Sequence, residues 1–381
     1  MKLDQSVAIL REAWELSDRI KETWQAGTAP DAAAALEEYP KLLLHRSIVI
    51  DLAYEDYLLR EKANAAPDIA EFAQKFPDHE ASVLDMLQAH RLLTSNPNLL
   101  ELPEAVWPET GSTFEGLEVR AELGRGTFGR AYLAFDPAIE RMRAVKFAPG
   151  GSAEAKLIGR LSHPNVTDIC WARPADYRTA VCMPFLGACT LADVIAANVK
   201  PESTARAILD AAEAGALDSL PEPRPPAIVW ESDSHLIGAC AIGARIAEAV
   251  DYLHGIHVVH GDLKPSNVIL EPGGSPRLID FNLAAGEESP TALRGTPAYM
   301  APELLEATMA GRGIQGIDEA KADLFALGVL LVEFLTGRHP FRTSEGGELA
   351  SLSEAIRKGP PSLPAALPRS VAGVLRSCMA V

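Results

Sequence analysis

The chain has few cysteines, and none of them forms the close pairs that build disulfide frameworks or zinc sites. Its five cysteines, at positions 170, 182, 189, 240 and 378, are scattered through 381 residues and include no C-x-x-C pair. An odd, scattered set is typical of reduced thiols in a cytoplasmic protein. We therefore expect a cytoplasmic location and plain thiols rather than a zinc site.

Net positive charge and long hydrophobic runs are also missing. The formal net charge is -17, whereas a nucleic-acid partner demands a basic face, so the composition argues against nucleic acid. No apolar run follows the N-terminal charge, and the longest apolar stretches, at 236–242 and 324–332, fall far short of the roughly 20 residues of a membrane span. We predict no signal peptide and no membrane segment in this chain.

The first part of the sequence has helical periodicity. Apolar spacing predicts helices over residues 4–24, 41–62, 67–76 and 79–93, which together would form a small all-helical domain at 1–96. The second helix carries one apolar-leaning stripe, formed by Leu43, Ser47, Ile50, Tyr54, Tyr57 and Leu58. Pro and Gly residues over 97–113 indicate a linker.

After the linker the pattern changes to short strands and then to helices. Strand-like runs at 114–119, 131–135 and 143–147 predict a β-rich lobe over about 114–186. Helical patterns from residue 191 onward predict an α-rich lobe over 187–381. Five prolines between about 199 and 234 indicate an insertion with one short helix at 204–216. The expected fold class is α+β.

A glycine-rich motif lies between two of the predicted strands. The run LGRGTFGRA at 123–131 contains G-x-G-x-x-G. Dinucleotide-binding folds share this motif, but there the glycines open a helix, whereas here strand-like residues lie on both sides. A β-hairpin whose glycines let backbone N–H groups approach phosphates fits the pattern. On this motif alone, a hairpin turn without any ligand remains an alternative.

Two charged residues follow at intervals that suit a nucleotide site. Lys146, near the end of a strand, can bridge the α- and β-phosphates. Such a lysine needs an anion to orient it, and Glu154, in the helix-forming run 153–161, is the best-placed candidate. Surface Lys and Glu are common, so either residue alone would more often be a solvated charge.

The decisive motifs come later and in a fixed order. They are HGDLKPSN at 260–267, LIDFN at 278–282 and GTPAYMAPE at 295–303. Over about residues 114–381 the sequence resembles the eukaryotic-type (Hanks-type) protein kinases, in the serine/threonine rather than the tyrosine pattern. The resemblance implies a bilobal protein-kinase fold preceded by a small all-α domain, ATP and Mg²⁺ as substrate and cofactor, and a protein substrate with a Ser/Thr acceptor.

The resemblance also implies residue roles. Asp262 would accept or orient the proton of the attacking hydroxyl, and Lys264 would neutralise the γ-phosphate. Lys146 paired with Glu154 would position the nucleotide. The implied metal ligands are Asn267 and Asp280, and the implied nucleotide-binding residues are Leu123, Gly124, Gly126, Gly129, Ala131, Ala144, Lys146, Met183, Leu186 and Ile269. Met183 would be the gatekeeper before a hinge at 184–186, and Asp323 would anchor the catalytic loop.

Other parts of the chain extend or depart from this pattern. The runs IDLAY at 50–54 and PDIAEF at 67–72 are similar to the helical leader of planctomycete serine/threonine kinases.

The region that resembles kinases also departs from the usual family pattern. Gly261 replaces the usual Arg, and Asn282 replaces the usual Gly. Related kinases bury the residue matching Glu303 against an arginine of a last helix that this sequence lacks, so we expect the domain to be truncated at its C-terminal end.

Two other functions compete with an active kinase. A pseudokinase scaffold would bind nucleotide without transfer, but it would usually lack one of the lysine, base or metal residues, and all of these are present. A small-molecule phosphotransferase of related fold would not need segment 295–303, which shapes a peptide-docking site in protein kinases. The sequence therefore favours a non-specific serine/threonine protein kinase that acts in signalling.

Overall fold

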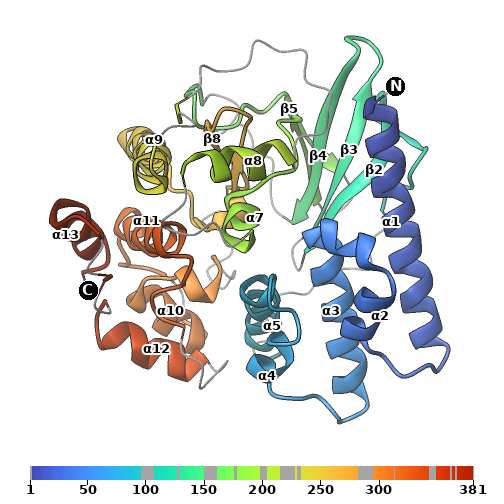
Figure 1. The fold of residues 1–381 in the computed structure, drawn as a ribbon, viewed down its shortest axis with the longest axis horizontal. Helices are drawn as coiled ribbons and strands as arrows, with labels where there is room; N and C mark the ends of the chain where they lie inside the picture. Colours follow the sequence, from blue (N-terminus) through green and yellow to red (C-terminus); the bar gives the residue numbers. More distant parts are fainter. Residues whose placement is uncertain are drawn as a thin grey trace. The chain divides into compact units, whose positions relative to one another are not determined.

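The computed structural model places helices before and after an antiparallel sheet along the chain (Figure 1). It describes residues 2–95, 107–126, 129–149, 161–175, 178–197, 204–214, 228–229, 233–281, 295–312, 314–342, 349–360, 363–364 and 367–380. The chain divides into two units. The first comprises 1–159 with 169–185, and the second comprises 160–168 with 186–381.

The first unit begins with the all-helical region. Its elements are α1 (Lys2–Gln25), α2 (Ala32–Glu38), the 3-10 helix η1 (Pro40–Leu44), α3 (Arg46–Lys62), α4 (Ile69–Ala73) and α5 (Glu80–Ser95). The helices surround one apolar core, in which Tyr57 and Phe72 meet edge to face with ring centroids 5.5 Å apart. Asp31 and Asp68 cap the starts of α2 and α4 through side-chain hydrogen bonds to backbone N–H groups.

The predicted helix at 41–62 is wrong at its start, and its stripe is out of register. The chain breaks at His45 between η1 and α3, so Leu43 lies 45% exposed. The buried face of α3 is formed by Ile48, Val49, Leu52, Ala53, Asp56 and Tyr57. The helices predicted at 4–24 and 79–93 are confirmed, the one predicted at 67–76 is shorter and ends at Ala73, and α2 was not predicted.

The sheet of the first unit has six antiparallel strands. They are β1 (Thr113–Phe114), β2 (Leu117–Gly126), β3 (Gly129–Asp136), β4 (Arg141–Pro149), β5 (Trp171–Ala175) and β6 (Arg178–Pro184), in the order β1-β2-β3-β4-β6-β5. The three predicted strand regions are confirmed, with a turn at Glu115-Gly116 that separates β1 from β2. One face of the sheet forms an apolar core around Val145 and Phe147.

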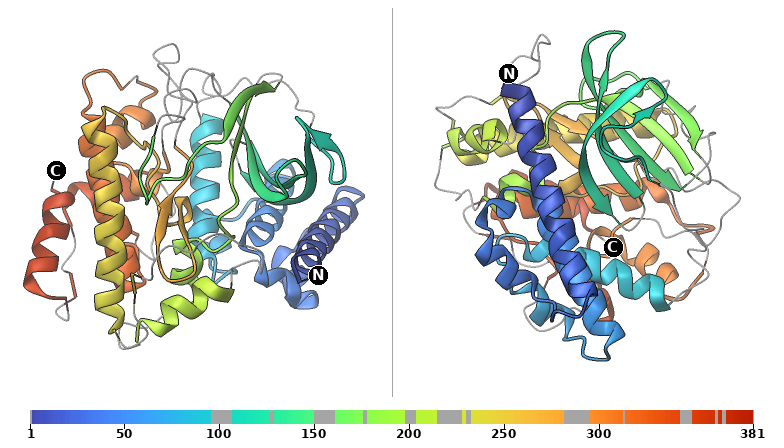
Figure 2. Two further views of the ribbon diagram at one scale, coloured as in Figure 1. Left: turned by 90° about the horizontal axis from the view of Figure 1, so that it is seen from above. Right: turned by 90° about the vertical axis from the view of Figure 1, so that its right-hand side faces the viewer.

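The second unit is mainly helical (Figure 2). Its elements are α7 (Leu191–Ala196), α8 (Arg206–Ala214), α9 (His235–Gly255), η3 (Pro265–Asn267), β7 (Val268–Leu270), β8 (Pro276–Leu278), η4 (Pro297–Tyr299), α10 (Pro302–Met309), α11 (Glu319–Thr336), α12 (Leu349–Arg357) and α13 (Arg369–Cys378). Helix α11 is buried on most of its surface and contacts α9, α13 and η4. It begins with a cap by Asp318 and ends at Gly337, whose φ of 68° suits glycine.

The predicted short helix of the insertion is confirmed as α8, with Ile208 and Ala212 buried. Most of the proline-rich stretch after α8 lies outside the described residues, as does most of the linker. Within the described part of the chain, no helix has the length and apolarity needed to cross a membrane.

Candidate active site

The carboxylate of Asp262 is surrounded by three hydrogen-bond donors of the second unit. Lys264 Nζ lies 2.8 Å from Oδ2, and Asn267 Nδ2 lies 3.0 Å from the same oxygen. Thr296 donates its hydroxyl to Oδ1 at 2.8 Å and accepts a hydrogen bond from Lys264 Nζ at 2.7 Å. The amide of Asn267 also donates to the backbone oxygen of Asp262 at 2.8 Å. These bonds fix the orientation of a half-buried carboxylate, as expected for a general base.

Asp323 holds the backbone in front of Asp262. This buried carboxylate accepts hydrogen bonds from the N–H groups of His260 (2.7 Å) and Gly261 (2.9 Å). Its Oδ2 also lies 3.0 Å from Nε2 of His254. A carboxylate on the first turns of α11 therefore fixes the loop that carries the base, which confirms the anchoring role predicted for Asp323.

His260 is fully buried and neutral. Burial lowers the pKa of its imidazole, because the charged form would lose its hydration. Its Nε2 lies 3.0 Å from the carbonyl oxygen of Ile279, and its Nδ1 accepts the N–H of Asp262 at 3.3 Å. The ring thus links the segment before Asp280 to the backbone of the candidate base, a connection that the sequence did not reveal.

Three residues of this site have left-handed backbone conformations. The φ angle is 74° at Gly261, 60° at Asp280 and 87° at Gly295. A Cβ built on Gly295 would stand 2.9 Å from the carbonyl oxygen of Gly261, so a side chain there could fit only if that backbone moved. The left-handed φ of Gly261 gives a separate, conformational reason for glycine at that position.

A small apolar pocket adjoins Asp262 in the second unit. Its volume is about 30 Å³, and its lining includes Thr296, Tyr299, Met300 and Leu304. Tyr299 donates its hydroxyl to the buried Glu333 at 2.6 Å. Segment 295–303 therefore has a fixed shape beside the candidate base. Glu303, in contrast, is exposed.

The predicted nucleotide-binding residues of the first unit lie on neighbouring strands. In the glycine-rich hairpin, Gly124 pairs with Ala131 and Gly126 pairs with Gly129. Lys146 lies on β4 between Ala131 of β3 and Val181 of β6. The remaining residues of this set are Leu123 on β2, Ala144 on β4 and Met183 on β6, and the register joins Ala144 to Met183. Glu154 lies outside the described residues.

The other predicted residues lie in the second unit. Ile269 on β7 pairs with Arg277 of β8 and bridges Thr190, while Leu186 precedes α7. Each of the two units thus contains some of the predicted nucleotide-binding residues. Asn282 lies outside the described residues.

Asn267 and Asp280 offer the hard oxygen ligands that Mg²⁺ prefers. The amide nitrogen of Asn267 is committed to Asp262, so its Oδ1 is the atom suited to a cation. Among the described residues, no group of three or more His, Cys, Asp or Glu side chains could hold a metal ion. Because Mg²⁺ is usually bound by one or two side chains together with substrate phosphates, this pair fits the ion.

Comparison with known families agrees with this geometry. Residues 231–372, which include the cluster around Asp262, match the family model described as Protein kinase domain. The matched segment lies in the second unit and is similar to protein kinase domains. The sheet with its glycine-rich hairpin and the helical second unit are the two lobes of the protein-kinase fold, and the helices α1 to α5 precede them in sequence.

Relatives with similar sequences include bacterial serine/threonine kinases. The chain is 29% identical over 273 residues to serine/threonine-protein kinase PknJ of Mycobacterium tuberculosis, which covers 66% of this chain and 39% of PknJ. It is 35% identical over 151 residues to serine/threonine-protein kinase PkaA of Streptomyces coelicolor, 38% of this chain and 26% of PkaA. The chain thus spans about two fifths or less of the length of these relatives.

Sequence reasoning identified Asp262, Lys264, Asn267 and Asp323 of this kinase domain, and the structure brings them together. The sequence also placed Thr296 in the serine/threonine pattern and in the shaping of the substrate site, but it gave no sign that the hydroxyl contacts both Asp262 and Lys264. The position of Thr296 directly after a glycine, at the start of the motif GTPAYMAPE, was the available signal.

Proposed function

We propose that this chain is a serine/threonine protein kinase that transfers the γ-phosphate of ATP to Ser/Thr hydroxyls of protein substrates in signalling. The observation that carries the proposal is the Asp262 carboxylate, held between Lys264, Asn267 and Thr296. Its environment combines a base, a cation and an amide ligand in one cluster, which is the set that phosphoryl transfer to a hydroxyl requires.

In the proposed reaction, the substrate hydroxyl oxygen forms a bond to the γ-phosphorus while the bond from that phosphorus to the bridging oxygen of ADP breaks. Asp262 accepts the hydroxyl proton. Lys264 balances negative charge on the transferred group, and Lys146 oriented by Glu154 would position the α- and β-phosphates. Mg²⁺, held by Asn267 and Asp280, would screen the phosphate charges.

The other expectations belong to the same proposal. A cytoplasmic location is supported by five cysteines that are all free. The proposed likeness to the helical leader of planctomycete kinases rests on the IDLAY and PDIAEF runs, and Leu52 and Ala53 of the IDLAY run are core residues. Asp51 of the same run forms an ion pair with Lys21.

The decisive experiment is transfer of labelled γ-phosphate to a mixture of generic peptides. Asp262→Asn should abolish transfer and leave ATP binding nearly intact, because the nucleotide contacts lie elsewhere. Asp251→Asn, at an exposed position on α9, is the matched control and should retain full activity. Transfer by Asp262→Asn within about tenfold of the parent would show that Asp262 is not the base.

Two outcomes would favour other functions. ATP binding by the parent chain without transfer to any peptide would favour a pseudokinase scaffold. Transfer to a small molecule but to no peptide would favour a small-molecule phosphotransferase.

A further inference from the structure

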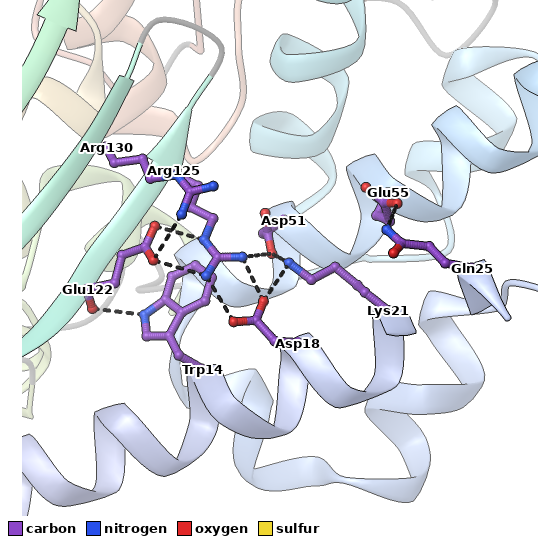
Figure 3. Close-up of polar contacts among 9 residues, drawn as sticks. All are labelled: Trp14, Asp18, Lys21, Gln25, Asp51, Glu55, Glu122, Arg125 and Arg130. Carbon is purple, nitrogen blue, oxygen red and sulfur yellow. Dashed lines mark hydrogen bonds and ion pairs between the residues drawn. The ribbon is translucent and has the colours of Figure 1, made fainter. Parts of the chain in front are cut away.

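Arg125 lies between the first two glycines of the glycine-rich motif, and its guanidinium is held both by its own strand and by the helices α1 to α5, the front helices. Its Nη1 and Nη2 lie 2.7 and 3.1 Å from the two carboxylate oxygens of Asp18 on α1 (Figure 3). Its Nε and Nη2 donate to the two oxygens of Glu122 on its own strand, at 2.7 and 2.9 Å. Bidentate pairs of this kind fix the plane of a guanidinium as well as its position.

The guanidinium also lies on an aromatic ring. Its Cζ is 4.4 Å from the ring centroid of Trp14, which is 4% exposed and belongs to the core of the front helices. The indole Nε1 of Trp14 donates to the backbone oxygen of Glu122 at 2.8 Å. The register of β2 against β3 shifts between Glu122 and Gly124, so this hydrogen bond lies at a β-bulge where the strand ladder is interrupted.

A second layer of charge holds the two helices together around Arg125. Lys21 of α1 lies 3.0 Å from Asp18 and 2.5 Å from Asp51 of α3, and Asp51 is 3.6 Å from Arg125. Burial disfavours the charge on Arg125, but its hydrogen bonds with Asp18 and Glu122 outweigh this and raise its pKa. Burial likewise opposes the charge on Asp18, yet the hydrogen bond from Arg125 leaves its pKa lowered. Both groups are therefore charged at neutral pH.

The first glycine of the motif touches the front helices as well. A Cβ built on Gly124 would stand 3.2 Å from the hydroxyl oxygen of Ser47 at the start of α3. Helices α1 and α3 thus contact three neighbouring positions of β2: Glu122 at the bulge, Gly124 and Arg125.

From these contacts we propose that the front helices position the glycine-rich hairpin for nucleotide binding, with Arg125 as the residue held and Trp14 and Asp18 as positioning residues. The inference rests on the proposed function, in which this hairpin binds ATP phosphates. Glycine leaves the backbone many conformations, so fixing a strand that contains Gly124 costs conformational entropy. Anchoring one of its strands to a folded helical layer reduces the freedom that would be lost when phosphates bind.

The test compares Asp18→Asn and Trp14→Phe with a matched control in the full chain. Asp18→Asn removes the bidentate carboxylate, and Trp14→Phe keeps an aromatic ring but removes the indole donor. The control is Glu55→Gln, because Glu55 on α3 accepts a hydrogen bond from Gln25 on α1 away from the hairpin (Figure 3). We expect both hairpin variants to raise KM for ATP about five- to tenfold, with KM for the peptide unchanged, and the control to change neither.

Two further measurements separate positioning from general damage. Amide hydrogen exchange in 117–126 and 129–136 should accelerate in Asp18→Asn and Trp14→Phe but not in Glu55→Gln. In a double-mutant cycle, Asp18→Asn together with Arg125→Gln should be no worse than the poorer single variant, because Asp18 acts through Arg125. A lowered Tm with an unchanged KM for ATP would indicate a structural role only and overturn the proposal.

The outcomes also distinguish this proposal from the proposed function. If the parent transfers phosphate and the variants keep the parent's KM for ATP, the positioning proposal is wrong and the kinase function stands. If the parent transfers no phosphate, the kinase function is wrong. The dissociation constants of the parent and the variants for ATP then test the positioning proposal. Weaker ATP binding in the variants, with faster exchange in the hairpin, would support positioning; unchanged binding would overturn it.

Discussion

Thr296 and Asp262 are joined by a hydrogen bond of 2.8 Å between the threonine hydroxyl and Oδ1, across 34 residues of sequence. Because Lys264 donates to the same hydroxyl oxygen and also lies against Oδ2, the three side chains form a closed ring of polar contacts. The start of the segment that shapes the neighbouring pocket is thereby tied to the candidate base. Position and orientation of the base depend on the threonine hydroxyl.

The first prediction removes that hydroxyl. Thr296→Ala should lower kcat for peptide phosphorylation by about 10- to 100-fold, because Asp262 loses the donor on Oδ1 and Lys264 loses an acceptor. Thr296→Ser keeps the hydroxyl and should remain within about threefold of the parent. Steady-state kinetics at saturating ATP would measure both, and equal rates for the Ala and Ser variants would contradict the role assigned to the hydroxyl.

The second prediction concerns the metal. Asp280→Ala should lose phosphoryl transfer and should bind ATP equally well with and without Mg²⁺, since a direct oxygen ligand is removed. Titration of a fluorescent ATP analogue at several Mg²⁺ concentrations would measure this. The affinity of the parent chain should depend on Mg²⁺; a parent whose ATP affinity ignores Mg²⁺ would argue against the site assigned to Asn267 and Asp280.

The third prediction tests the anchor of the catalytic loop. Asp323→Ala leaves the N–H groups of His260 and Gly261 and the ring of His254 without their shared acceptor. Each buried unsatisfied group costs about 1–3 kcal/mol, so the free energy of unfolding of this lobe should fall by about 3 kcal/mol or more. The expected fall in Tm is about 6–12 °C, measured by calorimetry. The exposed Asp251→Ala should change Tm by less than about 1 °C; a similar value for Asp323→Ala would disprove the anchoring role.

The fourth prediction is a loss of stability in mild acid. The pKa of His339 lies well below its ordinary value of 6.5. Burial is the main cause, and repulsion by the positive charge of the nearby Arg342 adds to it. In the neutral ring Nε2 donates to the backbone oxygen of Ala298 at 2.9 Å, and Nδ1 accepts the N–H of Phe341 at 3.2 Å. A second proton on Nδ1 would therefore break the hydrogen bond from Phe341.

The sign follows from this difference in protonation. The unfolded chain takes up a proton on His339 as the pH falls through about 6.5, whereas the folded chain does not, so acid favours unfolding below that pH. The free energy of unfolding contributed by His339 should fall by about 1.4 kcal/mol at pH 5.5. The difference in Tm between pH 7.5 and pH 5.5 should therefore shrink in His339→Gln. An unchanged difference would mean that other groups carry the acid sensitivity.

The fifth prediction is that activity does not require phosphorylation between residues 282 and 294. In kinases with arginine at the position of Gly261, that charge binds a phosphate on this segment, and glycine supplies neither charge nor donor. The ordinary acceptor positions there, Ser289 and Thr291, lie outside the described residues. The double variant Ser289→Ala, Thr291→Ala should keep its rate within about threefold of the parent. A hundredfold loss with the fold intact would show that another basic residue reads such a phosphate.

Residues with fixed chemistry were predictable from the sequence, because a base, a cation and a metal ligand at set spacing rarely occur together outside a phosphoryl-transfer site. The break at His45 was harder to predict, since helical periodicity continues across it and only Pro40 marks the start of a separate turn. Helix α2 was missed because its sequence, AAAALEE, has little contrast between apolar and polar positions. Its N-cap, Asp31, was the available signal.

The contacts of Arg125 were beyond prediction for a different reason. Asp18 lies 107 residues before Arg125 in the sequence, and no local pattern links two residues at that distance. An arginine inside a glycine-rich motif is most simply interpreted as a solvated charge. Only the packing of α1 and α3 against β2 turns it into the centre of a network.

The hydrogen bond from Trp14 to Glu122 also bears on how the part of this chain that carries the candidate active site can be produced. A chain shortened to begin at residue 107 would keep every strand of the sheet and still lose the ring beneath Arg125, the donor at the bulge and the carboxylate of Asp18. The strand surface that the front helices cover would then face water, with an arginine paired only to its own strand. Weak activity in such a shortened chain would report on a damaged hairpin, not on the catalytic capacity of the intact protein.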